Sequence, residues 1–278
     1  MKKLLSVLLA ISIIFFQTAT VFSLNVPIKI AEDKENGTFV TYQDDADGNI
    51  ILKEYHNGEY VKKVQIYKGS PYNLYITDYT VANNEVYTID TRQVCLANQQ
   101  ITNNNNNTRA ASSTYMGRIT YDATGGTRRI SVSYSSAFYS SSSYTLNGNV
   151  GSLATLTGLI LSVLALPGAI GGAVVNWLIA GAGVVVSGSN YIFPQTSLGC
   201  EETRYTFELT DVDYTGHTNS FTSSKYYITD QRPEYSQYRN TTFWNGFNPA
   251  TCWRNTDFGN TVFYHMFTDT YFRIISWT

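Results

Sequence analysis

Residues 150–186 read VGSLATLTGLILSVLALPGAIGGAVVNWLIAGAGVVV. They lie inside a longer segment, between Arg129 and Glu201, that contains no Asp, Glu, Lys, Arg or His. Alternation typical of a strand is lost here, and Pro167-Gly168 divides the stretch because it cannot continue a helix. The sequence therefore predicts an apolar helical hairpin. Its first arm shows helical spacing at Leu153, Leu156, Ile160 and Leu164.

Two roles of this hairpin stay open. Each arm of about seventeen residues would be roughly 25 Å long, slightly less than the bilayer core of about 30 Å. Gly, Ala, Ser and Thr dilute the Leu and Ile, so insertion into a membrane is marginal. That suits a protein that must leave its producer and later enter another membrane. The same pattern also suits a core element wrapped by strands.

If the hairpin enters a membrane, Gly168 and Gly172 offer a flat face for close helix contact, which favours self-association there. Asn176 would need a hydrogen-bond partner. Before use the hairpin must be stored, because an exposed patch of this size aggregates, and we expect the surrounding aromatic β-domain to shield it. The predicted membrane-inserting residues are Leu153, Leu156, Ile160, Leu164, Pro167, Gly168, Gly172, Trp177, Ile179 and Gly181.

Short alternating runs lie upstream of the hairpin. They are separated by turn residues such as Asp47-Gly48 and Asn57-Gly58, which supply the positive φ of tight hairpins. Residues 24–96 are therefore predicted to form an antiparallel β-meander module. The runs are Phe39–Tyr42, Ile50–Tyr55, Tyr60–Tyr67, Leu74–Tyr79 and Val86–Asp90.

Residues 97–114 are Asn-rich and lack an apolar face, which predicts a linker. The basic residues change across it, because Lys dominates before the linker and Arg after it. Arg109 is a natural cleavage point for a protease. The first module is then either a removable pro-region or a tethered domain.

Strand patterns resume at Tyr115 and continue after Glu201 to the C-terminus. They include Thr261–Phe267, where both faces are largely apolar. The predicted fold is mainly β: an antiparallel β-meander module plus an aromatic-rich β-sandwich or open barrel, residues 115–278, that carries the inserted apolar helical hairpin.

The N-terminus predicts the compartment. Lys2-Lys3, the apolar run Leu4–Phe16 and the small-residue pattern ending at Ser23 are typical of a secretory signal peptide, residues 1–23. We expect processing after Ser23 and a secreted, extracellular product. Among its three cysteines, Cys200 and Cys252 would close a loop of about fifty residues worth roughly 3–4 kcal/mol. The alternative is that Cys95, Cys200 and Cys252 are buried thiols.

Composition excludes several functions. The 278 residues include 14% charged and 14% aromatic residues, with a net charge of −2. Such a chain lacks the positive electrostatic potential that attracts nucleic acid. The histidines at positions 56, 217 and 265 are not spaced as ligands of one metal ion, and the sequence contains no cofactor-binding motif. Residues Gln43–Glu54 fit a hairpin turn better than a calcium-binding loop. We expect no catalytic site, although an unrecognised one near His217 or His265 stays open.

Aromatic residues cluster in two C-terminal stretches. Phe243–Phe247 and Cys252–Arg254 fit either a surface for sugars or lipid headgroups, or packing of a β-core.

Three features together resemble one protein family. They are the Met1-Lys2-Lys3 signal, a leader containing Gly48–Tyr55 and Asn57–Lys63, and the Gly/Ala-rich apolar segment. The combination resembles the geobacillin-type large secreted bacteriocins of Gram-positive bacteria. The resemblance implies an exported antibacterial protein that acts on related cells. The chain differs from small bacteriocins in its size and in lacking cationic balance, which argues against electrostatic capture by anionic lipid.

The leading hypothesis is a secreted, non-enzymatic antibacterial protein, with neither cofactor nor metal, that permeabilises the membrane of a target cell through its hairpin. The alternative is a non-enzymatic secreted surface or matrix β-protein whose hairpin is permanent core.

Overall fold

The computed structural model describes residues 27–45, 47, 49–68, 73–82, 85–95 and 112–278. These residues are mainly in antiparallel strands, with an inserted helical hairpin, which confirms the predicted fold class. The described chain forms two compact units. One contains the N-terminal strands together with Leu146–Gln195, and the other contains the remaining residues up to Thr145 and from Thr196 to Thr278.

The first unit contains a six-stranded meander in which every strand pairs with its neighbour in sequence. We call this sheet the cover. Its turns follow the residues that favour them: Asn57 and Gly58 both have positive φ, at 50° and 88°. The strands are β1 (Ile28–Asp33), β2 (Thr38–Asp44), β3 (Ile50–His56), β4 (Glu59–Lys68), β5 (Asn73–Ala82) and β6 (Glu85–Cys95).

The turn between β2 and β3 was the possible calcium loop. The Asp45 carboxylate instead accepts hydrogen bonds from the backbone N–H groups of Asp47 (2.9 Å) and Asn49 (2.8 Å). This confirms the hairpin-turn interpretation.

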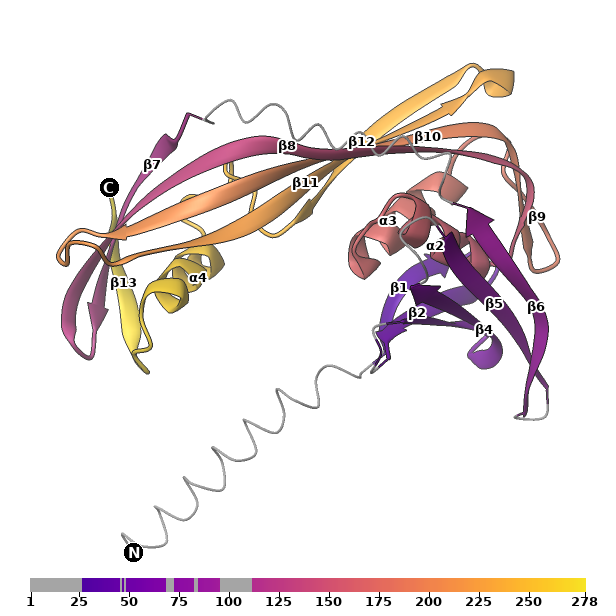
Figure 1. Ribbon diagram of the computed structural model, residues 1–278, viewed down its shortest axis with the longest axis horizontal. Helices are drawn as coiled ribbons and strands as arrows, with labels where there is room; N and C mark the ends of the chain where they lie inside the picture. Colours follow the sequence, from indigo (N-terminus) through magenta and orange to yellow (C-terminus); the bar gives the residue numbers. More distant parts are fainter. Residues whose placement is uncertain (1–26, 46, 48, 69–72, 83–84, 96–111) are drawn as a thin grey trace, which may run out of the picture. The chain divides into compact units, whose positions relative to one another are not determined.

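Two helices complete the first unit, α2 (Leu153–Val163) and α3 (Gly168–Ile179), and they lie on one face of the cover (Figure 1). They are joined through Ala165, which has a positive φ of 51°, and are bent by 120°. The arms are shorter than predicted, with 11 and 12 residues. The second arm ends at Ile179, and beyond it Gly183 adopts positive φ and Val185–Ser187 form a strand.

The second sheet has the strand order β12-β11-β10-β8-β7-β13, and β9 pairs with β10. Long strands β8 and β10 carry the chain into and out of the hairpin segment. The strands are β7 (Thr114–Ala123), β8 (Gly126–Gly151), β9 (Val185–Ser187), β10 (Asn190–Asp211), β11 (Thr218–Arg232), β12 (Gln237–Asn245) and β13 (Phe272–Trp277), with a short 3₁₀ turn η3 (Pro233–Tyr235) before β12.

A helix forms where a strand was predicted. α4 covers Thr256–Met266, so the expected strand Thr261–Phe267 is wrong. Its start is capped by the Asn255 side chain, which accepts hydrogen bonds from the N–H groups of Asp257 (2.8 Å) and Phe258 (3.3 Å). Buried Phe258, Val262, Phe263 and Met266 share one helical face. The alternation of aromatic residues concealed this spacing.

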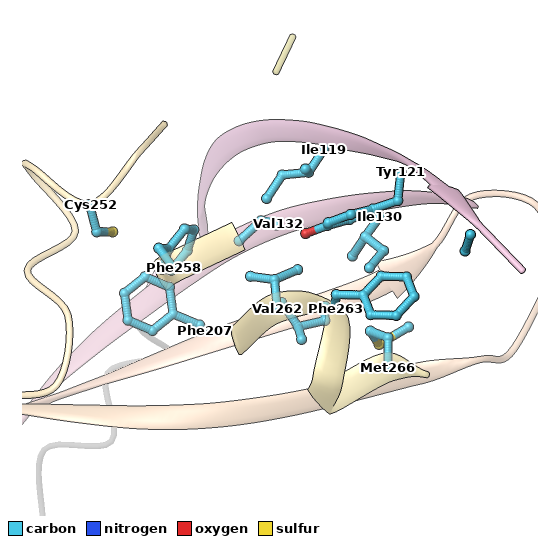
Figure 2. Close-up of a cluster of buried hydrophobic side chains, with 12 residues drawn as sticks. Ile119, Tyr121, Ile130, Val132, Phe207, Cys252, Phe258, Val262, Phe263 and Met266 are labelled. Carbon is cyan, nitrogen blue, oxygen red and sulfur yellow. The ribbon is translucent and has the colours of Figure 1, made fainter. Parts of the chain in front are cut away.

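The core of the second unit lies between α4 and the curved sheet (Figure 2). Phe258 and Phe207 are fully buried with ring centroids 5.3 Å apart, and the Tyr121 hydroxyl donates a hydrogen bond to the Gly259 carbonyl at 2.7 Å. Edge-to-face contacts between aromatic rings stabilise a fold beyond the contribution of the buried apolar area. α4 is therefore anchored to its sheet.

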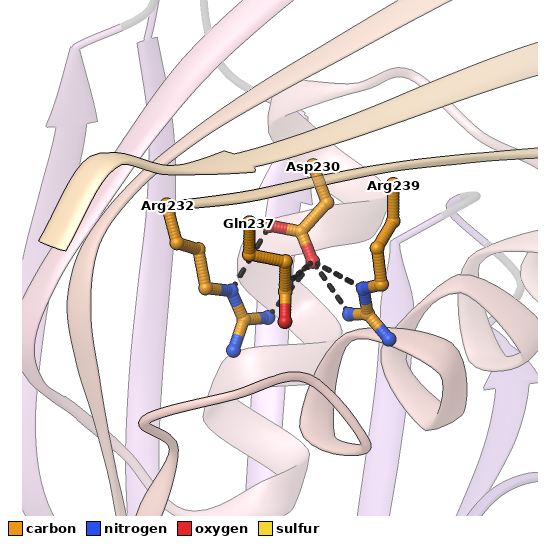
Figure 3. A network of polar contacts seen from close by, with 4 residues as sticks. All are labelled: Asp230, Arg232, Gln237 and Arg239. Carbon is orange, nitrogen blue, oxygen red and sulfur yellow. Dashed lines mark hydrogen bonds and ion pairs between the residues drawn. The ribbon is translucent and has the colours of Figure 1, made fainter. Parts of the chain in front are cut away.

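A charged cluster lies on β11 and β12 of the same unit (Figure 3). The buried Asp230 carboxylate accepts two hydrogen bonds from buried Arg232, Nε at 3.0 Å and Nη2 at 3.0 Å, and another from Arg239 Nε at 3.1 Å. Ion pairs this deep are stabilising only when both partners are present. The cluster therefore has a structural role.

Candidate functional site

α2 lies directly on the cover at Gly158. A Cβ atom at this position would lie 3.2 Å from Ile66 Cδ1, 3.3 Å from Leu52 Cδ1 and 3.5 Å from Val64 Cγ1. These three cover residues are buried, as are nine of the eleven residues of α2. Burying a large aliphatic side chain contributes about 1.5–3 kcal/mol, so this contact is the apolar centre of the unit.

The N-terminus of α2 depends on the cover for a negative charge. No acidic residue occupies its first turn, although the Ser152 side chain accepts a hydrogen bond from Thr155 N–H at 3.3 Å. Glu54 Oε2, from β3, accepts one from Ala154 N–H at 2.8 Å. A carboxylate at this end of a helix is favourable because the exposed N–H groups carry partial positive charge.

α3 approaches the backbone of β1 even more closely. A Cβ atom on Gly172 would lie 2.0 Å from the Ile30 carbonyl oxygen, and one on Gly168 would lie 3.0 Å from the Tyr42 ring. The two glycines that were predicted to form a helix-contact face in lipid therefore face the cover. Asn176 Oδ1 accepts a hydrogen bond from Glu32 N–H at 2.9 Å, so its partner also belongs to the cover.

A third polar contact joins the cover to the start of β10. The Tyr191 hydroxyl donates a hydrogen bond to Asp33 Oδ2 at 2.8 Å, and both side chains are buried. Burial raises the pKa of Asp33, but hydrogen bonds from Asn36, Tyr191 and the Glu35 N–H outweigh that effect and hold the pKa below its ordinary value. Asp33 is therefore ionised at neutral pH.

Two cavities lie at the edge of this contact surface. One cavity of about 530 Å³ is lined by residues that include Glu54, His56 and Lys62. Another, of about 460 Å³, is lined by Glu32, Asn176 and others. Both are large enough for several water molecules. The cover is therefore held by an apolar centre under α2 and by hydrogen bonds around it.

The structure brings the predicted membrane-inserting residues together, but mostly inside. Leu153, Leu156, Ile160 and Leu164 are buried, and Gly172 is buried against β1. Pro167, Gly168, Trp177, Ile179 and Gly181 are half-buried, and Gly181 follows the end of α3. The expected shield was the aromatic β-domain, whereas the structure places the N-terminal sheet against the hairpin.

The outward face of α3 is apolar as well. Ala169 is exposed, and Ile170, Ala173 and Trp177 are half-buried. A helix that is apolar on every side is typical of deep burial or of a membrane. No single helix among the described residues has the length and hydropathy to cross a bilayer, but the bent pair α2–α3 meets those criteria jointly.

Sequence reasoning missed the residues that join the cover to the hairpin and to the strand after it, namely Glu32, Asp33 and Glu54 of the cover and Tyr191 of β10. One signal was available for Glu54. It alternates in phase with buried Leu52 on β3, so a carboxylate lies on an otherwise apolar strand face and requires a buried partner. The partner itself is 100 residues away in sequence, at Ala154.

The expected disulfide is wrong. Cys200 and Cys252 are both buried free thiols, in β10 and in the core beside α4. Burial, with nearby Glu202, raises the pKa of Cys200 to about 12, and burial raises that of Cys252 to about 11. Thiols in this state are poor nucleophiles. Cys95 lies in β6, and its side chain is outside the described part, as are Ser23 and Arg109.

The other predicted features are structural. Phe247 and Trp253 pack against the core of the second unit, which supports core packing over a binding surface. His265 stacks on Phe221 at 4.9 Å, and His217 lies at the edge of Phe267. Within the described residues, no group of three or more His, Cys, Asp or Glu side chains is arranged to hold a metal ion.

Comparison with protein-family models, with curated proteins and with solved structures finds no match to this chain.

Proposed function

We propose that this chain is an exported antibacterial protein in which the cover stores an apolar hairpin that permeabilises a target membrane after the cover has left. One observation carries the proposal. The hairpin glycines approach β1–β4 closely, and the hydrogen bonds of Ala154 and Asn176 to the cover are also made with these strands. All four strands precede the predicted linker, residues 97–114. Cleavage at Arg109 would therefore separate the hairpin covalently from the strands that hold it.

Cleavage alone does not release the hairpin. The apolar contacts of Gly158 and the hydrogen bonds of Glu32, Asp33 and Glu54 remain after the chain is cut. Release in solution is unfavourable because it would expose the apolar face of α2 to water. A bilayer changes this balance because it offers the same face an apolar solvent. Release is then expected at a membrane surface rather than in solution.

The cover also blocks self-association. Gly168 and Gly172 form the surface on which helices approach closely in lipid, and in the stored state Tyr42 and the Ile30 carbonyl occupy it. Arms of 11 and 12 residues reach only about 17–18 Å, less than the bilayer core. A bent pair of this length disturbs one leaflet by itself and requires several copies to permeabilise both.

The proposal is tested with dye-loaded liposomes and a site-specific protease sequence placed within residues 97–114. Cut protein should release dye and uncut protein should not. A Glu32→Cys/Asn176→Cys pair, in a Cys95→Ser background, is designed to form a disulfide that locks the cover to α3. The positions are suitable because the Asn176 side chain already reaches the Glu32 backbone. Oxidised locked protein should stay inactive after cutting and regain activity on reduction. Equal release from cut and oxidised locked protein would refute the proposal.

The near-complete burial of α2 favours a second candidate, a secreted surface or matrix β-protein whose hairpin is permanent core. It predicts that cut protein stays assembled with liposomes present and releases no dye. The same assay distinguishes the two.

A further inference from the structure

A second surface, in the other unit, lies between α4 and β13. Here a groove of about 640 Å³ is lined by Thr256, Asn260, Tyr264, Tyr271, Arg273 and Trp277, among others. We infer that this groove binds hexopyranose sugar units of a surface glycan. The inference is independent of the hairpin.

Two tyrosine rings line the groove, and both are exposed. Tyr264 is 66% exposed and Tyr271 is 62% exposed. Exposed rings lose free energy in water without gaining packing. Tyrosine rings that keep one face open are suited to stack on the C–H face of a pyranose ring, and their hydroxyls can bond to sugar hydroxyls.

The Tyr264 ring and the backbone at Tyr271 are held in place before any ligand arrives. Tyr264 meets Phe272 nearly perpendicularly, at 88° with centroids 5.2 Å apart, and Phe272 stacks on buried Phe263 at 4.0 Å. The Tyr271 carbonyl accepts a hydrogen bond from Thr124 N–H at 3.3 Å, which fixes the backbone beside β13. A fixed site loses less conformational entropy on binding.

The polar groups of the groove fit a largely uncharged ligand with many hydroxyls. Asn260 offers an amide, and Thr256 and Thr270 offer hydroxyls. Arg273 is the only charged residue of the lining, and Asp122 balances it at 3.4 Å. Amide and guanidinium groups can each bond two neighbouring sugar hydroxyls. The half-buried Ile274 and Trp277 side chains complete the lining.

Gly259 explains how the two elements come so close. Its Cβ would lie 2.5 Å from Ile274 Cδ1 and 3.0 Å from the Trp277 ring, so the absence of a side chain at this position lets α4 lie close against β13. The groove therefore follows from the way α4 is anchored.

The same sugar chemistry occurs in two sources, a wall polysaccharide and a glycolipid headgroup. The uncut full chain should be titrated calorimetrically with soluble oligosaccharides, including chitotetraose and maltotetraose. It should also be sedimented with phosphatidylcholine vesicles that contain or lack a diglucosyl diacylglycerol. Binding of the oligosaccharides alone indicates a polysaccharide, and binding that requires the glycolipid vesicle indicates a headgroup.

Variants localise the binding. Tyr264→Ala and Tyr271→Ala should each weaken it by about tenfold or more, whereas Tyr264→Phe should retain most of it because the ring remains. Tyr235→Ala removes an exposed ring outside the groove, 50% exposed, and should bind normally. The inference is overturned if neither source binds, if vesicles bind equally without glycolipid, or if Tyr264→Ala and Tyr271→Ala bind like the unchanged chain.

Discussion

Two helical elements among the described residues pack against sheets in different ways. α4 is amphipathic: its buried face carries Phe258 and Phe263, while Asp257 and His265 face outward. The pair α2–α3 has no charged residue, and the outward face of α3 is apolar too. A polar outer face keeps a helix on its sheet in water, whereas a helix apolar on every side needs a cover. α4 is therefore a core element of its unit, whereas α2–α3 is the element that we propose to be stored.

The first prediction concerns the core element α4 and has the largest expected effect. Phe258→Ala removes a fully buried ring that contacts Phe207, Phe221 and Phe247. The expected loss is about 3–5 kcal/mol because a cavity remains. Urea unfolding followed by near-ultraviolet circular dichroism measures it. Asn260→Ala, on the same helix, serves as the control, and a comparable loss there would contradict the assignment of the core.

The second prediction concerns the pair α2–α3. Gly172→Ala places a methyl group against the Ile30 carbonyl oxygen, so α3 must move away from β1. The expected cost is about 1–3 kcal/mol. After cleavage in the linker, the variant should lose its cover at a lower urea concentration, as measured by gel filtration. Ala169→Ser, on the exposed side of α3, should match the unchanged protein. Unaltered retention of the cover by Gly172→Ala would show that the close approach is unimportant.

The third prediction tests the charge at the start of α2. Glu54→Gln keeps the shape of the side chain but removes the carboxylate that accepts the Ala154 N–H, at a cost of about 1 kcal/mol. Retention of the cover after cleavage should weaken by about fivefold. Glu59→Gln, at an exposed position of β4, is the matched control. If both variants behave alike, Glu54 does not stabilise the helix.

The smallest effect concerns pH. The pKa of Asp33 is lower in the folded protein, so its contribution is complete above its unfolded pKa, near 4, and is lost as pH falls through the folded value. In a Glu54→Gln background, the free energy of unfolding of the uncut chain, measured with urea, should hold from pH 7 to about pH 4 and fall progressively below it. Asp33→Asn should make that profile flatter. A profile that does not change on this substitution would exclude Asp33 as the titrating group.

Local features of the fold could be predicted from the sequence. Asn57-Gly58 marks a tight hairpin through its φ values, and Pro167-Gly168 separates two helical arms. α4 was misread because Val262, Phe263 and Met266 fit a helical face only when the capping signal Asn255 is recognised.

Long-range features could not be predicted. That β1–β4 cover the hairpin depends on contacts between residues 100 or more positions apart, such as Asn176 with Glu32, which are 144 apart. Periodicity reports which face of an element is apolar but not which other element covers it. The groove between α4 and β13 was missed because the sequence of α4 was predicted to form a strand.

The most direct test of a stored hairpin is to follow the cover itself. Protein cut in the linker and labelled on the cover at Lys29 should be floated with liposomes, alongside a sample without lipid. We expect the cover to remain with the rest of the chain in buffer, and with liposomes to stay in the aqueous fraction while the hairpin segment floats with lipid. Cover and hairpin that remain together in the aqueous fraction would contradict this account and leave the hairpin as permanent core.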